Sequence, residues 1–175
     1  MASSDEYQQL PLIKVVGISA SGKSTLVKAL RRHGYNTRPV SQEHSNVADL
    51  WQQFDQPKIL IYLDVDLETQ RSRRPDVTWD KLWLREENTR LDHARGHAEL
   101  KINTAGLSSE TVLQIAITFL QNEGIRHADH ALPSLNATGS ALQSAAEIVE
   151  DSESEVDAKT LTRAERRKLK RKNRK

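Results

Sequence analysis

The 175-residue sequence contains no cysteine. Disulfide bonds, a catalytic thiolate and cysteine-based zinc sites are therefore excluded, and this composition fits a reducing compartment such as the cytoplasm. No apolar run approaches the roughly 20 residues that a membrane-spanning helix needs. The first nine residues are polar and include Asp5 and Glu6, so they do not resemble a signal peptide. We expect a cytoplasmic protein without a membrane span.

The net charge of +2 hides an uneven distribution of charge along the chain. Residues 147–158 carry six acids and no base, whereas residues 159–175 carry ten bases and one acid. A basic segment of this kind attracts polyanions without reading their sequence, so it predicts non-specific binding to nucleic acid, to the ribosome or to an acidic membrane surface. A tail that is simply solvated remains the alternative.

One motif in the sequence is specific. Residues 17–24 read Gly-Ile-Ser-Ala-Ser-Gly-Lys-Ser, which matches the phosphate-binding pattern G-x-x-x-x-G-K-[ST]. Gly17 and Gly22 let the backbone curl so that successive N–H groups point at phosphate oxygens. A helix that begins near Lys23 adds its positive dipole end, the Lys23 ammonium would contact the β- and γ-phosphates, and the Ser24 hydroxyl would ligate Mg²⁺. The predicted nucleotide-binding residues are Gly17, Ser19, Ala20, Ser21, Gly22, Lys23, Ser24 and Thr25.

The residues around this loop agree with it. A β-branched run at 12–16 predicts a strand before the loop, and apolar spacing over 24–33, ended by Gly34, predicts a helix after it. Further along, strands and helices alternate, which favours a parallel sheet that is covered on both faces. The expected strands are 35–40, 58–63 and 99–103, and the expected helices are 46–54, 67–74, 79–94 and 109–121.

Together these patterns predict an α/β protein with a three-layer P-loop NTPase fold, a short parallel sheet and a disordered C-terminal tail. In the helix at 79–94 we expect Trp79, Leu82, Trp83 and Leu91 to form the apolar face. The composition shifts to Ala, Ser, Asn and Glu beyond about Gly124, and then to Lys and Arg. We therefore expect a P-loop domain at 10–123, a flexible acidic linker at 124–158 and a basic tail at 159–175.

Three segments together resemble the P-loop small-molecule kinases, the group that contains nucleoside, nucleotide and shikimate kinases. They are the loop at 17–25, the stretch at 61–68 with Arg71, Arg73 and Arg74 after it, and residues 100–110. The resemblance covers about residues 10–123. It implies an ATP-dependent, Mg²⁺-requiring kinase that transfers phosphate to a small metabolite or a nucleoside-like acceptor.

The resemblance also implies roles for single residues. Lys23, Arg71 and Arg74 would stabilise the charge that develops during phosphoryl transfer. Glu43, which follows the second expected strand, would orient or deprotonate the acceptor hydroxyl. Asp64 ends an apolar strand in the manner of a Walker B acid and would share Mg²⁺ with Ser24, although Asp66 and Glu43 are alternatives for this second ligand.

No obvious strand with a Walker B acid lies between Val40 and Lys58, and this departs from the kinase pattern. Two other functions therefore remain open. One is an NTPase that uses water as nucleophile and has no small acceptor. The other is a nucleotide-binding module that attaches to nucleic acid through residues 159–175. A GTPase is disfavoured, since the sequence has no Asn-Lys-x-Asp segment.

Overall fold

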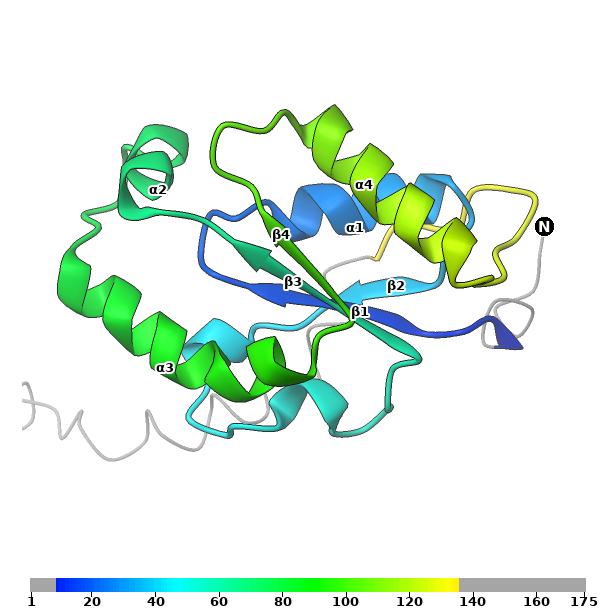
Figure 1. Cartoon of the computed structure of the whole chain (residues 1–175), viewed down its shortest axis with the longest axis horizontal. Coiled ribbons are helices and arrows are strands. Elements are labelled where there is room, and N and C mark those ends of the chain that lie inside the picture. The colour runs from blue at the N-terminus through cyan, green and yellow to red at the C-terminus, as the bar shows by residue number, and fades with distance from the viewer. Residues whose placement is uncertain (1–8, 136–175) are drawn as a thin grey trace, which may run out of the picture. The chain divides into compact units, whose positions relative to one another are not determined.

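The computed structural model describes residues 9–135. Its sheet has four parallel strands in the order β2-β1-β3-β4 (Figure 1). The strands are β1 (Ile13–Gly17), β2 (Thr37–Pro39), β3 (Ile59–Asp64) and β4 (Leu100–Asn103). The helices are α1 (Lys23–Arg32), α2 (Leu67–Arg73), α3 (Lys81–His97) and α4 (Ser109–Asn122), with short 3₁₀ turns η2 (Gln42–His44) and η3 (Leu50–Gln52).

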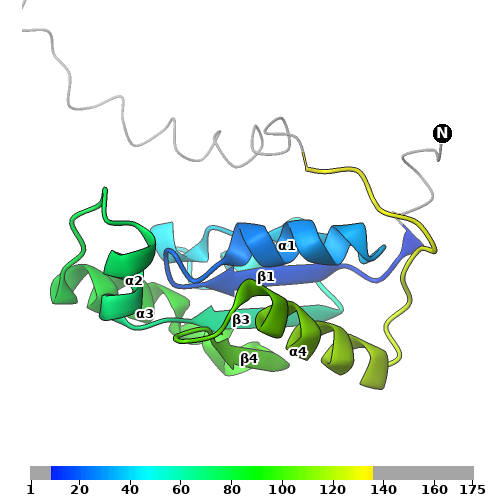
Figure 2. The ribbon, with the colours of Figure 1, turned by 90° about the horizontal axis from the view of Figure 1, so that it is seen from above.

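Helices cover both faces of the sheet, because the side chains of β1 and β3 alternate between two apolar clusters. On one face Ile13 and Ile61 pack with the apolar stripes of α1 and α4. On the other face Val16 and Tyr62 pack with Leu91 of α3. Figure 1 shows α1 and α4 on one side of the strands and α3 on the other, and Figure 2 shows α1 running along β1. The three-layer P-loop α/β fold predicted from the sequence is confirmed.

The sheet places the P-loop at the carboxyl ends of its strands, where ligands of open α/β sheets bind. The loop leaves β1, which lies between β2 and β3, and enters α1 directly. β2 has three residues, ends at Pro39 and lies at an edge of the sheet, where proline is tolerated. The described residues from Val40 to Lys58 contain no strand, as the sequence suggested.

The predicted amphipathic helix at 46–54 is wrong. Only the single turn η3 forms there, with Trp51 buried, Val47 exposed and Phe54 exposed at a positive φ of 68°. The carboxylate of Asp49 accepts from two glutamine side chains that follow it, and these contacts alone do not extend the turn into a helix. The amide of Trp51 is instead held by the side chain of a residue in η2.

The apolar face expected for the helix at 79–94 is only partly correct. Trp79 and Leu91 are buried, but Leu82 and Trp83 are 69% and 43% exposed. The helix buries Glu87 instead, and this residue lies beside the P-loop rather than in solvent. Trp83 therefore lies at the mouth of a polar cluster, not in the core.

The compact unit that contains the P-loop ends at Ser134, beyond the boundary after residue 123 that the composition suggested. Ile125 and Leu132 are buried, and the amide of Leu132 donates to the carbonyl of Arg31 (2.8 Å). The expected linker beyond residue 135 and the expected basic tail at 159–175 lie outside the described residues, so both stay predictions. Within the described part of the chain, no helix is long and apolar enough to cross a membrane.

Candidate functional site

Side chains from three parts of the chain hold the carbonyl groups of the P-loop. Five successive carbonyls accept such bonds. The bonds are Lys23 Nζ to Gly17 O (2.9 Å) and Ile18 O (3.1 Å), Gln70 Nε2 to Ser19 O (3.1 Å), Arg73 Nη1 to Ala20 O (3.0 Å) and Thr104 Oγ1 to Ser21 O (3.2 Å). Of the N–H groups in the loop, that of Ile18 donates to Leu63 O (3.1 Å), that of Ser19 to Glu87 Oε2 (3.3 Å) and that of Ser21 to Ile18 O (3.1 Å).

The two motif glycines serve different purposes. A Cβ on Gly17 would lie 2.2 Å from the carbonyl oxygen of Leu63, so only glycine lets β1 run this close to β3 at its end. Gly22 has a φ of 98° and precedes α1 without a side-chain cap. The first N–H groups of α1 have no acceptor inside the helix and are open to an anion. The hydroxyl of Ser21 is also buried without a partner among the described residues, which fits a phosphate oxygen.

Lys23 makes a buried ion pair with Glu43. The Lys23 Nζ lies 2.5 Å from Glu43 Oε1, and the two side chains are 12% and 4% exposed. Glu43 belongs to η2, directly after β2, so the sheet brings it to the phosphate-binding lysine although the two residues come from different loops. Its second oxygen, Oε2, is buried and has no partner within the described residues. This oxygen therefore has no hydrogen-bond donor within residues 9–135.

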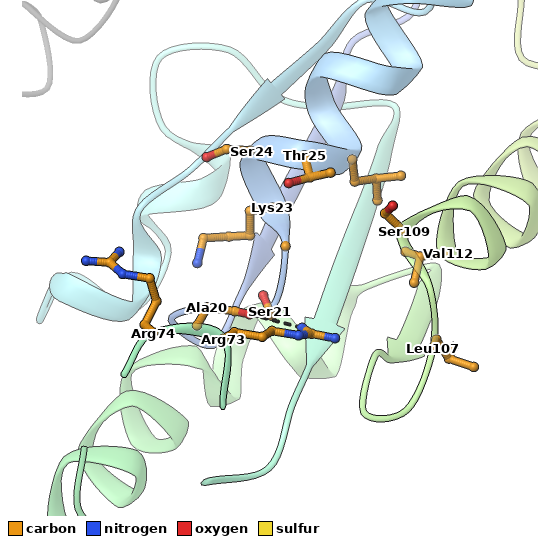
Figure 3. A pocket seen from close by; sticks show the side chains of 12 residues that line it. Ala20, Ser21, Lys23, Ser24, Thr25, Arg73, Arg74, Leu107, Ser109 and Val112 are labelled. Atoms are coloured by element: carbon orange, nitrogen blue, oxygen red, sulfur yellow. Dashed lines mark hydrogen bonds between the residues drawn. The ribbon is translucent and has the colours of Figure 1, made fainter. Parts of the chain in front are cut away.

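A cleft of about 490 Å³ opens beside the P-loop (Figure 3). It lies between the loop, the end of α2 and the start of α4, and its size suits a nucleotide. The residues that line it are Ala20, Ser21, Gly22, Lys23, Ser24, Thr25, Leu26, Arg73, Arg74, Leu107, Ser109 and Val112. Six of the eight nucleotide-binding residues predicted from the motif are among them, whereas Gly17 and Ser19 support the loop from behind.

The three arginines of α2 and its C-terminus have separate contacts. Arg73 donates to Ala20 and to the carbonyl of Thr104 (2.7 Å), so it ties the helix to the loop. Arg71 donates twice to the carbonyl of Trp79 (3.1 and 2.9 Å), which places it on the connection to α3 rather than in the cleft. Arg74 lines the cleft, and within residues 9–135 its side chain donates only to Asp76, from Nε (2.9 Å) and Nη2 (2.8 Å). This contact holds the pKa of Asp76 below its usual value. Arg74 is therefore the arginine of this set that a phosphate can recruit most readily.

The other candidate metal ligands have local partners. Asp64 ends β3, and its Oδ1 accepts the amide of Val65 (2.9 Å). Asp66 is the N-cap of α2, because its carboxylate accepts the amide of Thr69 (2.7 Å), which lowers the pKa of Asp66. Glu43 is thus the carboxylate that the structure brings to Lys23. Among the described residues, no three carboxylate or histidine side chains gather as a metal cluster.

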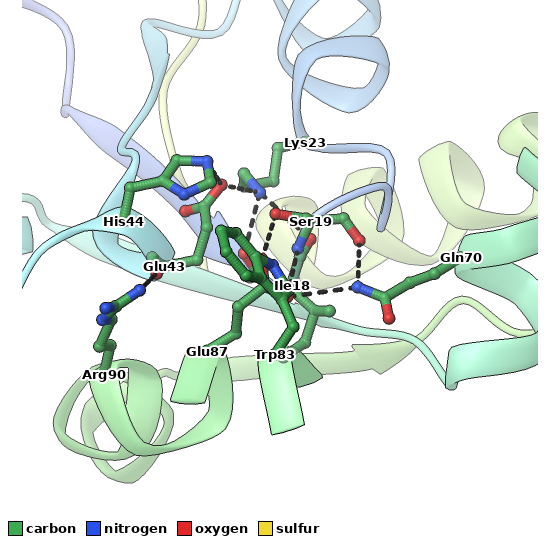
Figure 4. A network of polar contacts seen from close by, with 10 residues as sticks. Ile18, Ser19, Lys23, Glu43, His44, Gln70, Trp83, Glu87 and Arg90 are labelled. Atoms are coloured by element: carbon green, nitrogen blue, oxygen red, sulfur yellow. Dashed lines mark hydrogen bonds and ion pairs between the residues drawn. The ribbon is translucent and has the colours of Figure 1, made fainter. Parts of the chain in front are cut away.

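Sequence reasoning missed a second group of polar residues at the P-loop (Figure 4). Glu87 of α3 is fully buried and accepts hydrogen bonds from Ser19, from Gln70 and from the indole of Trp83. Nothing in the sequence near Glu87 marks it, since it is one acid among many on a charged helix. Only the fold brings it to a loop that is 68 residues away in the sequence.

No protein-family model matches this chain, and no curated protein is similar to it in sequence. Among solved structures, it is similar to shikimate kinase from Acinetobacter baumannii in complex with shikimate. The TM-score is 0.49 at 15% sequence identity, and the match covers 71% of this chain and 100% of that chain. A similarity this distant does not show what the chain does. What each side chain does has to be argued from its own contacts.

Proposed function

We propose that this protein is an ATP-dependent phosphotransferase that transfers the γ-phosphoryl group to a hydroxyl of a small metabolite or nucleoside-like acceptor. The observation that carries this proposal is the ion pair between Lys23 and Glu43, which joins the phosphate-binding lysine to a buried carboxylate with one free oxygen. In a kinase such an acid positions the acceptor hydroxyl.

In this mechanism the N–H groups of Ala20 and of residues 22–25 bind the phosphates of ATP. Lys23 moves from the carbonyls of the loop to the β- and γ-phosphates, where its charge stabilises the transition state. Arg74 leaves Asp76 and adds a second positive charge on the far side of the cleft. Glu43 Oε2 accepts the proton of the acceptor hydroxyl as the oxygen attacks the γ-phosphorus, and the bond from this phosphorus to the β,γ-bridging oxygen breaks so that ADP leaves.

The residues present also fit Mg²⁺, which would supply the charge that neutralises the β- and γ-phosphates. The Ser24 hydroxyl is exposed at the first turn of α1 and lines the cleft, as a P-loop metal ligand should. The unpartnered oxygen of Glu43 offers a second acceptor for the water shell of the ion. Asp64 remains the alternative for that position.

Acceptor-dependent ADP release tests this function. ATP turnover is measured alone and with a panel of nucleosides, nucleotides, sugars and small hydroxy acids, and product is identified by mass. We expect at least one acceptor to raise ADP release well above the rate with water, and Lys23→Ala to abolish both nucleotide binding and turnover. Equal turnover with and without every acceptor would instead support an NTPase. Tight nucleotide binding without turnover would support a binding module.

A further inference from the structure

Glu87 lies against the P-loop with no exposed surface. Four donors surround its carboxylate (Figure 4). Ser19 provides two of them, its amide to Oε2 (3.3 Å) and its hydroxyl to Oε1. Gln70 Nε2 donates to Oε2 (3.2 Å), and the indole Nε1 of Trp83 donates to Oε1 (3.1 Å). The group therefore joins the P-loop, α2 and α3.

A buried carboxylate at this place needs an explanation. Burial of such a charge costs several kcal/mol, and within residues 9–135 no lysine, arginine or histidine forms an ion pair with Glu87. The acid also has the same sign as the phosphates that the loop binds. A neutral acceptor would avoid both costs, but hydrogen bonds to a carboxylate are roughly twice as strong as neutral ones. Glu87 thus supplies a strong acceptor for the Ser19 amide, whereas a weak acceptor would compete poorly with phosphate for this N–H group.

The peptide groups on both sides of Ser19 are held by this cluster. The amide of Ser19 points to Glu87, while its carbonyl accepts from Gln70 Nε2 (3.1 Å), the same nitrogen that donates to Glu87. An amide that points to Glu87 does not point into the nucleotide cleft. The phosphates are then left to the N–H groups of Ala20 and of residues 22–25, since the amide of Ser21 donates to the carbonyl of Ile18 (3.1 Å).

We propose that Glu87 is a positioning residue of the nucleotide site: it anchors Ser19 to α3 and to Gln70 of α2, and so determines which P-loop amides face the phosphates. This inference rests on the proposed function only in that the loop binds a nucleotide, and it does not depend on the acceptor. Its role is to hold the Ser19 amide when a competing anion occupies the loop.

The affinity for Mg·ADP tests the role of Glu87. Glu87→Gln keeps the size of the side chain but replaces one carboxylate oxygen with an NH₂ group. This NH₂ group then faces the donors that the lost oxygen had accepted from. We expect the dissociation constant to rise about tenfold, the effect of losing one or two strong hydrogen bonds. Glu86→Gln is the matched control, because that neighbouring side chain is 61% exposed and lies 3.9 Å from Arg90. It should leave the affinity unchanged.

Two further measurements separate positioning from simple stability. If Glu87 acts through Ser19, the double variant of Ser19→Ala and Glu87→Gln should bind no more weakly than Glu87→Gln alone. A lower melting temperature of Glu87→Gln with a dissociation constant within twofold of wild type, measured well below melting, would show a structural acid only and overturn the inference. If Glu87→Gln does not fold, Ser19→Ala alone decides, and an unchanged affinity overturns it. A wild-type protein that binds no Mg·ADP would overturn the proposed function as well.

Discussion

Replacing Glu43 with glutamine should tighten the binding of metal-free ADP while it slows turnover. Glu43 Oε1 lies 2.5 Å from Lys23 Nζ and its side chain is almost completely buried. A phosphate that reaches Lys23 comes within about 5 Å of this carboxylate, where two unit charges repel by about 3 kcal/mol at an effective dielectric constant of 20. Glutamine keeps the shape of the side chain and removes the repulsion.

The same substitution acts on the empty site. Removing one partner of a buried ion pair costs about 3–5 kcal/mol when nothing replaces it. Lys23 keeps its bonds to the carbonyls of Gly17 and Ile18, so the loss here should be smaller. A bound phosphate restores a partner to Lys23, and both effects therefore favour the complex. Because solvent screens part of the repulsion, we expect the dissociation constant of ADP to fall about tenfold, or ~1.4 kcal/mol.

Calorimetric titration with ADP in EDTA, and again with Mg²⁺, measures this change. Turnover with a productive acceptor should fall by about 10²–10⁴, the usual contribution of a general base. Glu123→Gln is the control, since it removes the same charge at the exposed end of α4. Weaker binding of metal-free ADP by Glu43→Gln would refute the electrostatic reasoning. Unchanged turnover would refute the role of Glu43 as base.

Three other predictions follow from the contacts described above. Arg74→Ala should lower kcat about 100-fold with little change in KM for ATP, because one charged hydrogen bond is lost in the transition state. Arg73→Ala should instead raise KM for ATP, because it frees the P-loop. The reverse pattern in steady-state kinetics would contradict this assignment. Burial raises the pKa of Tyr62 from 10.0 to about 12, so the unfolded chain releases the phenol proton at lower pH than the folded protein does. The free energy of unfolding should therefore fall as the pH rises from 10 to about 12. Urea unfolding at pH 9 and pH 11 measures this fall, and Tyr62→Phe should reduce it. Gly22→Ala should cost about 1–2 kcal/mol for its positive φ alone, and Gly17→Ala clearly more, because its Cβ would meet the backbone of β3; equal losses in urea unfolding would show that this contact relaxes freely.

Local signals in the sequence were sufficient for the strands, for most helices and for the P-loop. β-Branched runs such as Ile59–Leu63 predict buried strands without knowledge of their neighbours, and the motif at 17–24 carries its own geometry. The spacing of Val47, Trp51 and Phe54 also looks helical. Tertiary contacts decide that segment instead, since the backbone of Trp51 is bound to the side chain of Gln42.

The site was predictable only where one segment supplies it. Glu43 could be nominated through the kinase resemblance, but its contact with Lys23 depends on β2 lying beside β1. Glu87 could not be found at all, because its partners lie up to 68 residues away. The arginines of α2 look equivalent in the sequence. Their different roles follow from which acceptor each one meets, and this is a property of the packed structure.

The bonds that hold the P-loop carbonyls have a kinetic consequence. A loop that must order itself around a phosphate gives up conformational entropy in every binding event, which lowers affinity and slows association. Here that entropy is lost during folding, through side chains of α2 and of the segment after β4. Nucleotide capture should therefore proceed at the rate of a rigid site. The amide hydrogens near Ser19 should exchange slowly even before any nucleotide arrives.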